Sequence, residues 1–167
     1  MVTCFCAPGG EGDMAPLLEN VNRMAASSLQ QWITQSRNSM SASQLQPIPL
    51  NIRVQLEPYY DLQVLDTARY KVGDADEMNA AHTLMQNPDV NAVTLVDVIV
   101  FRNQDDAQNN VALWAHELKH VQQYLQWGVQ DFALRYTRDY NAVEAPAYQI
   151  QGQVARAIRP SVASSAK

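Results

Sequence analysis

The sequence predicts an α+β fold, and three stretches carry this prediction. Between residues 15 and about 40, apolar residues recur at spacings of three and four, which is typical of a helix buried on one side. Residues 93–101 are rich in β-branched side chains, as strands are. From about residue 110 onward the pattern is helical again. We therefore expect an N-terminal helix, a small sheet and a set of C-terminal helices.

Composition indicates one soluble domain and argues against two classes of partner. The 167 residues are 47% hydrophobic and 17% charged, with a net charge of -5 and a pI of about 5.0. A nucleic-acid-binding protein would need a basic patch, which this acidic balance does not suggest. No apolar run approaches the roughly 18 residues of a membrane span. We expect an irregular lead-in over 1–14, one domain over 15–160 and a frayed tail over 161–167.

The region between the first helix and residue 93 reads as short elements. Residues 51–57 alternate apolar and polar side chains, which predicts a strand ended by Pro58. Residues 62–65 form a turn of helix or a connector, and residues 68–72 alternate again as a second strand. Asp76 is expected to cap a helix from 77 to about 86. That helix carries His82, which we interpret as structural or exposed rather than as a metal ligand.

The second half contains the strongest strand and the longest helices. Residues 93–101 are either one long strand or two short ones that turn near Val96 and Asp97. A polar loop then leads to a helix from about 110 to 126, for which Gly128 is a fitting end. Further helical segments run to about residue 158, before Pro160.

The most informative stretch is His116-Glu117-Leu118-Lys119-His120, which lies within the helix predicted from about residue 110. On a helix, positions i and i+4 share one face, so both imidazoles can bind one metal ion. Glu117, one step round, can take a proton from water at the metal's open position. This is the arrangement of a zinc peptidase. The apolar residues around the motif indicate a helix buried on one side.

A catalytic zinc usually has three protein ligands, so a third is expected downstream. Asp131, Asp139 and Glu144 are the candidates, because no further histidine follows His120. Glu144 lies in an apolar helical segment, and a buried carboxylate there would need a partner such as a metal. We favour Glu144 over Asp139. Asp131 follows Gly128 too closely to fold back.

The motif also supports a resemblance to a known family. His116-Glu117-x-x-His120 followed by a helical Glu144 resembles the gluzincin pattern. More narrowly, residues from about 47 to 148 resemble the zinc metallopeptidase domain found at the core of extracellular contractile injection systems and in bacterial secreted proteins. The matching features are the strand-like 94–101, the polar loop and residues 114–124. The resemblance implies a minimal zincin-like fold, with Zn²⁺ on His116, His120 and Glu144 and with Glu117 as the base.

A zincin also needs an edge strand beside its cleft and a donor for the oxyanion. Residues 93–101 are the candidate strand. Tyr136, Tyr140 and Tyr148 lie near Glu144, and the last two are four residues before and after it, on the same helical face. Tyr140 and Tyr148 are thus candidate catalytic residues beside Glu117, and the sequence does not choose among the three tyrosines.

The leading functional hypothesis is a zinc-dependent peptide-bond hydrolase, endopeptidase-like, that acts on a peptide or protein substrate. The alternative is a non-catalytic zinc-bearing domain for binding or toxin-associated interaction. We expect an extracytoplasmic location, periplasmic or secreted, in which Val2 follows a removed signal peptide. A cytoplasmic protein, with Cys4 and Cys6 as free thiols, is the alternative.

Overall fold

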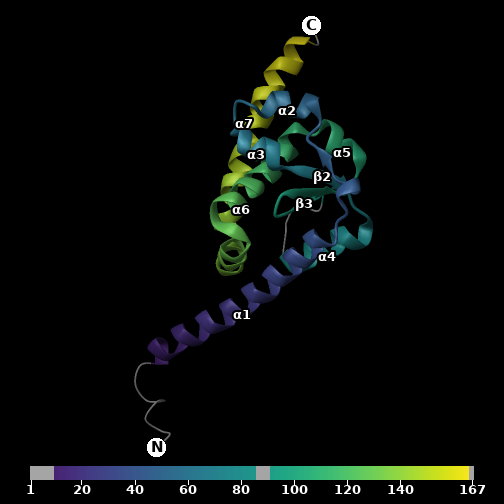
Figure 1. Cartoon of the computed structure of the whole chain (residues 1–167). Helices are drawn as coiled ribbons and strands as arrows, with labels where there is room; N and C mark the ends of the chain where they lie inside the picture. The colour runs from purple at the N-terminus through teal and green to yellow at the C-terminus, as the bar shows by residue number, and fades with distance from the viewer. Residues whose placement is uncertain (1–9, 86–90, 166–167) are drawn as a thin grey trace, which may run out of the picture.

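The computed structural model describes residues 10–85 and 91–165, and it confirms the α+β class. Its helices surround a small mixed sheet, with α1 leading into the body and α6 and α7 packed side by side (Figure 1). The helices are α1 Gly10–Asn38, α2 Leu50–Leu56, α3 Leu62–Thr67, α4 Ala75–Met85, α5 Gln104–Asn109, α6 Val111–Arg138 and α7 Tyr140–Ser165. The strands are β1 Gln46–Pro47, β2 Arg69–Val72, β3 Ala92–Leu95 and β4 Val98–Phe101.

The four strands lie in the order β1-β2-β4-β3. β2 runs parallel to β4, and the two outer pairings are antiparallel. β3 and β4 form a hairpin whose turn contains Val96 at φ 63°, so the two-strand interpretation of 93–101 is confirmed. Arg37 of α1 anchors this turn, because its Nε and Nη2 donate to the Asp97 carboxylate at 2.5 and 3.1 Å. In this strand order β3 is the terminal strand on its side of the described sheet.

The two faces of the sheet carry separate hydrophobic cores, as the alternation of side chains along a strand requires. Ile99 and Phe101 of β4 pack with α2, α3, α5 and the first half of α6. Val98 and Val100 face the other way, toward α1, α4, α7 and the second half of α6. The first half of α6 therefore lies under one face of the sheet, and α1 covers the other.

One predicted strand is wrong, because residues 50–56 form helix α2. Ile52 and Leu56 are fully buried, whereas Val54 between them is 57% exposed. The alternation of three apolar residues also contains an i, i+4 pair, and a pattern this short fits both periods. The helix is the structure that forms, because it buries Ile52 and Leu56 together against the core. The strands expected at 68–72 and in 93–101 are present as β2, β3 and β4.

Several helix ends differ from the expectation. α1 begins at Gly10 rather than near residue 15, with Pro16 inside the helix. Asp74, not Asp76, caps α4, since its Oδ1 accepts from Glu77 N at 2.8 Å. α7 continues through Pro160 to Ser165, beyond the end expected near residue 158. A proline removes one hydrogen bond, but the helix can resume beyond it with a kink. Residues 1–9, with Cys4 and Cys6, and residues 166–167 lie outside the described part.

Gly128 does not end α6 but bends it. Its φ of 79° and ψ of 163° are not helical, and helical geometry resumes on both sides. Side chains other than glycine rarely adopt a positive φ, so this position suits glycine. The bend turns the second half of α6 so that Phe132 and Tyr136 enter the core on the α1 side. In the described residues no helix is long and apolar enough to cross a membrane.

Candidate metal centre

The first half of α6 presents the motif from a rigid, buried position. Asn110 caps the helix, its Oδ1 accepting from Leu113 N at 3.1 Å. Trp114 is fully buried, and its indole N–H donates to the Ala107 carbonyl at 2.8 Å. His116 is 0% and His120 5% exposed. Both imidazoles therefore sit in the interior on one face of the helix, as the i, i+4 spacing predicts.

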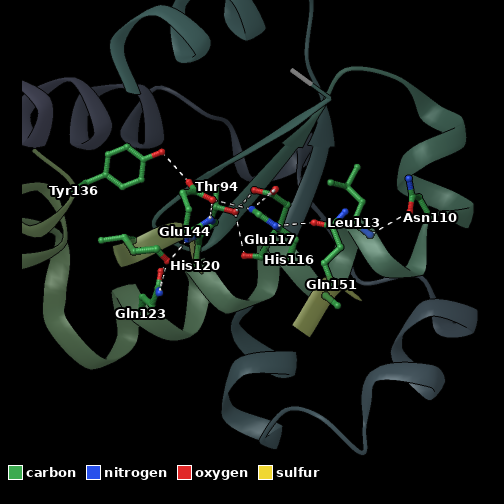
Figure 2. A network of polar contacts seen from close by, with 12 residues as sticks. Thr94, Asn110, Leu113, His116, Glu117, His120, Gln123, Tyr136, Glu144 and Gln151 are labelled. Carbon is green, nitrogen blue, oxygen red and sulfur yellow. Dashed lines mark hydrogen bonds and ion pairs between the residues drawn. The ribbon is translucent and has the colours of Figure 1, made fainter. Parts of the chain in front are cut away.

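Helix α7 brings Glu144 to the two histidines. Glu144 Oε1 lies 2.9 Å from His116 Nε2 and 3.1 Å from His120 Nε2, and the carboxylate is buried (Figure 2). The three potential ligand atoms lie within 4.8 Å of one another. Glu144 thus lies beside the two histidines, as we expected of the favoured candidate for the third ligand.

The other candidates lie elsewhere. Asp131 is paired with Arg135 at 3.0 Å on the surface of α6. Asp139 follows the end of α6, where its exposed carboxylate accepts from Ala142 N at 3.3 Å. His82 is exposed on α4. None of these three belongs to the buried His-His-Glu group.

Glu117 faces the same group without joining it. Its Oε2 lies 3.8 Å from His116 Nε2, and the residue is only 1% exposed. The Thr94 hydroxyl, on β3, lies 3.0 Å from Glu117 Oε1 and 3.1 Å from the Glu117 carbonyl oxygen, and can donate to either. The terminal strand of the sheet therefore helps to hold the carboxylate that follows the first histidine.

The three tyrosines have different surroundings. The Tyr136 hydroxyl donates to Glu144 Oε2 at 2.7 Å, so it holds the candidate ligand (Figure 2). Tyr148 packs its ring edge-on against His116, with centroids 4.6 Å apart, and is 44% exposed. The ring of Tyr140 contacts that of Tyr136 at 6.2 Å. Tyr148 is thus the one of the two candidate catalytic tyrosines that touches a histidine of the group.

Neighbouring groups in this cluster shift one another's pKa values. Burial would lower the pKa of His116, but the hydrogen bond with Glu144 and the charge of Glu117 outweigh it and raise that pKa. Burial would raise the pKa of Glu144, but its contacts with His116, His120 and Tyr136 dominate and lower it. Burial and the nearby Glu144 raise the pKa of Tyr136. Glu144 is therefore ionised at neutral pH, and Tyr136 remains a donor.

This donor set suits a metal ion. Two imidazole nitrogens and one carboxylate oxygen are the ligands of several catalytic zinc sites, in which a fourth position stays open. The three residues are buried, and each makes a further hydrogen bond that fixes its orientation. The group can hold a divalent cation, and borderline-soft zinc matches imidazole and carboxylate together.

A comparison with protein families gives one match. Residues 47–128 match the family model described as the eCIS core domain, a domain found in extracellular contractile injection systems. This segment is similar to the eCIS core domain. The match confirms the resemblance to the domain of extracellular contractile injection systems, and the gluzincin-like character of that resemblance stays a prediction. Searches of curated proteins and of solved structures found no match.

The matched segment runs from Pro47 in β1 to the bend in α6. It contains the sheet, both histidines and Glu117, and it ends before Glu144. The N-terminal helix α1 also lies outside it. The candidate metal group is therefore completed by a residue from beyond the matched part of the chain.

The group borders a very small cavity of about 10 Å³, lined by side chains of α4, β3, both halves of α6, and α7. Pockets that bind small molecules typically enclose about 300–1,000 Å³. All four residues of β3 are buried as well. In this conformation the cavity has room for about one water molecule beside the group, and a peptide would need it to widen.

Sequence reasoning missed the residues that support the group. These are Thr94 beside Glu117, Gln123 beside His120 and Gln151 beside His116. Thr94 was a polar residue between apolar neighbours in the first part of the strand-like stretch, which was a signal for a buried hydrogen bond. Gln123 lies three residues after His120, on the same helical face. Gln151 had no distinguishing signal.

Proposed function

We propose that the protein is a zinc-dependent peptide-bond hydrolase with His116, His120 and Glu144 as metal ligands. One observation supports this over a purely structural metal site. A second buried carboxylate, Glu117, lies beside the ligand atoms and is held by Thr94. A site that only stabilises a fold has no need of a positioned carboxylate that adjoins the ligands without belonging to them.

The residues of the chain have distinct roles in this proposal. A zinc ion there would supply a Lewis acid that polarises the peptide carbonyl and makes water more acidic. Glu117 accepts the proton from the attacking water and returns it to the leaving amine. Thr94 keeps Glu117 Oε1 in place, which leaves Oε2 toward His116. Tyr136 holds Glu144 through its second carboxylate oxygen.

The zincin-like fold and the substrate side of the site belong to the same proposal. β3 is the terminal strand, and it carries Thr94, so it is the natural candidate to pair with an extended peptide. Tyr148, in contact with His116 and partly exposed, is a better candidate than Tyr140 for the oxyanion donor. The hydroxyl of Tyr136 already donates to Glu144.

The alternative, a zinc-bearing binding domain without turnover, is favoured by the closed cavity. Structural zinc sites are closed and catalytic ones keep a position open, and the free space here is only about 10 Å³. In that case Glu117 would serve as a fourth ligand. An extracytoplasmic location is proposed with either function, on the basis of the family in which this domain occurs.

Zinc content tests the metal site. We expect about one zinc per chain in the purified wild-type protein, and its loss in His116→Ala and in His120→Ala. His82→Ala is the matched control, since this exposed histidine lies outside the group. Full zinc occupancy in both motif variants would refute the assignment of the ligands.

Glu117→Gln then separates the two functions. Glutamine keeps the size of the side chain but cannot accept the proton. For a hydrolase, we expect this variant to retain zinc and to cleave a denatured protein at least roughly a hundredfold more slowly, as loss of a general base does. For the binding domain, the variant would lose zinc affinity, and the wild type would cleave nothing. Unchanged turnover in the zinc-loaded variant would remove Glu117 from the mechanism.

A further inference from the structure

The ring nitrogens that face away from Glu144 both contact glutamine oxygens. His120 Nδ1 lies 2.8 Å from Gln123 Oε1, and His116 Nδ1 lies 2.8 Å from Gln151 Oε1. Figure 2 shows the two glutamines on the outer sides of the two imidazoles, one from α6 and one from α7. Each histidine is thus held between a neutral amide and the shared carboxylate of Glu144.

The orientation of the Gln123 amide is set by a third group. Its Nε2 lies 3.0 Å from the Val143 carbonyl oxygen, which can only accept a hydrogen bond. The NH₂ end must therefore point to Val143, and the oxygen end must point to His120. An amide oxygen only accepts, so the proton between Gln123 and His120 has to reside on His120 Nδ1.

This arrangement decides what the other ring nitrogen offers. A neutral imidazole carries one proton, so a protonated Nδ1 leaves a lone pair on Nε2. In His120 that lone pair points at Glu144 Oε1, 3.1 Å away, which is itself an acceptor. Two acceptors at this distance need a cation between them, either a proton, which turns the ring into an imidazolium, or a metal ion. His116 has the same pairing of atoms, with Gln151 on one side and Glu144 on the other.

We propose that Gln123 and Gln151 are positioning residues that keep both histidines protonated on Nδ1, so that their Nε2 lone pairs meet at Glu144 and receive a divalent metal ion. The inference deepens the proposed function and rests on its metal site, but not on peptide hydrolysis. It assigns to two neutral amides the role that carboxylates have beside many metal-bound histidines.

Neutral partners suit the charge of this interior. Glu117 and Glu144 already place two carboxylates in a region where both are at most 3% exposed. Further buried anions would each carry a large desolvation penalty. An amide oxygen fixes the ring without adding charge. Gln123 also joins α6 to α7 through Val143, so one side chain sets the histidine and the spacing of the two ligand-bearing helices.

The experiment compares metal affinity in Gln123→Leu and Gln151→Leu with that in two control variants. Gln122→Leu is the control on α6, because Gln122 Oε1 accepts from Lys119 Nζ at 2.8 Å and not from a histidine. Gln149→Leu is the control on α7, at an exposed position. Zn²⁺ and Co²⁺ affinities are measured by competition with a chelator. We expect each test variant to bind about 10–100-fold more weakly than the wild type, as loss of such partners does elsewhere, and each control to bind within about twofold.

A second measurement uses only the wild-type protein, so its result does not depend on whether the variants fold. In protein with ¹⁵N-labelled histidine and no metal, NMR should show a proton on Nδ1 of both His116 and His120. A bare Nδ1 on either ring would overturn the proposal, as would equal metal affinity in test and control variants. If the wild type binds metal with the expected pattern but hydrolyses no peptide, the proposal stands and the peptidase function fails. If the wild type binds no metal, both fail.

Discussion

Replacing Tyr136 by Phe removes one hydrogen bond from the candidate metal centre and little else. The hydroxyl donates to Glu144 Oε2 at 2.7 Å, and both residues are buried. The ring stacks on Phe132 with centroids 5.6 Å apart, and a phenylalanine ring can keep this contact. The substitution should therefore loosen the position of the Glu144 carboxylate, and the packing of the core should change little.

The magnitude follows from the type of bond. A hydrogen bond from a hydroxyl to an ionised carboxylate contributes about 1.5–3 kcal/mol, and a short buried one belongs to the stronger class. Each 1.4 kcal/mol corresponds to a factor of ten in affinity. If the bond serves to hold Glu144 in its ligand position, Tyr136→Phe should weaken zinc binding by about 10–100-fold.

The assay is a chelator competition for Zn²⁺, with urea unfolding of the metal-free protein beside it. Tyr70→Phe is the matched control, because the hydroxyl of this buried tyrosine accepts from Gln108, away from the metal group. We expect the control to keep its zinc affinity. Zinc affinity in Tyr136→Phe equal to that of the control would show that the hydroxyl does not hold the ligand.

Three further predictions concern the same fold and site. Glu144→Ala should weaken zinc binding far more than Asp139→Ala, since only Glu144 lies at the histidines; equal losses in a metal-content assay would contradict this. Folding lowers the pKa of Glu144, so this carboxylate should stabilise the metal-free protein at pH values above the ordinary pKa of glutamate and lose this effect as the pH falls. Folding raises the pKa of His116, so this imidazole should stabilise the metal-free protein below about pH 6.5 and lose this effect as the pH rises. Thermal unfolding at several pH values should thus show greatest stability between these limits, and a metal-free protein that is most stable at pH 9 would refute it. Gly128→Ala should destabilise by about 1–2 kcal/mol, because alanine is strained at the positive φ although space is open around it; Gly152→Ala, inside α7 at ordinary helical φ, is the contrast, and equal urea midpoints would count against the bend.

The sequence could predict those parts of the site that depend on local spacing. His116 and His120 are four residues apart on one helix, so their common face follows from helix geometry alone. Glu144 was expected from the conflict between a carboxylate and its apolar segment, and the structure places it at the histidines. The α+β class likewise followed from long periodic segments, which are the most reliable pattern.

What the sequence could not predict depends on packing between distant segments. Thr94 and Glu117 are 23 residues apart, and Gln151 and His116 are 35 apart, so their contacts appear only once β3, α6 and α7 have packed. The residues that became α2 show a different problem. Their alternation fitted a strand as well as a helix, and only the buried pair Ile52 and Leu56 distinguishes the two.

The bend at Gly128 has a consequence for how this domain can be exchanged between proteins. The matched segment ends at that glycine, yet Tyr136, Glu144 and Gln151 all follow it. A gene fusion cut at the edge of the match would inherit both histidines without the carboxylate that joins them. A fusion that keeps the whole candidate metal group must therefore include both α6 and α7 along with the sheet. The shortest segment that contains the group and its supporting residues extends at least to Gln151.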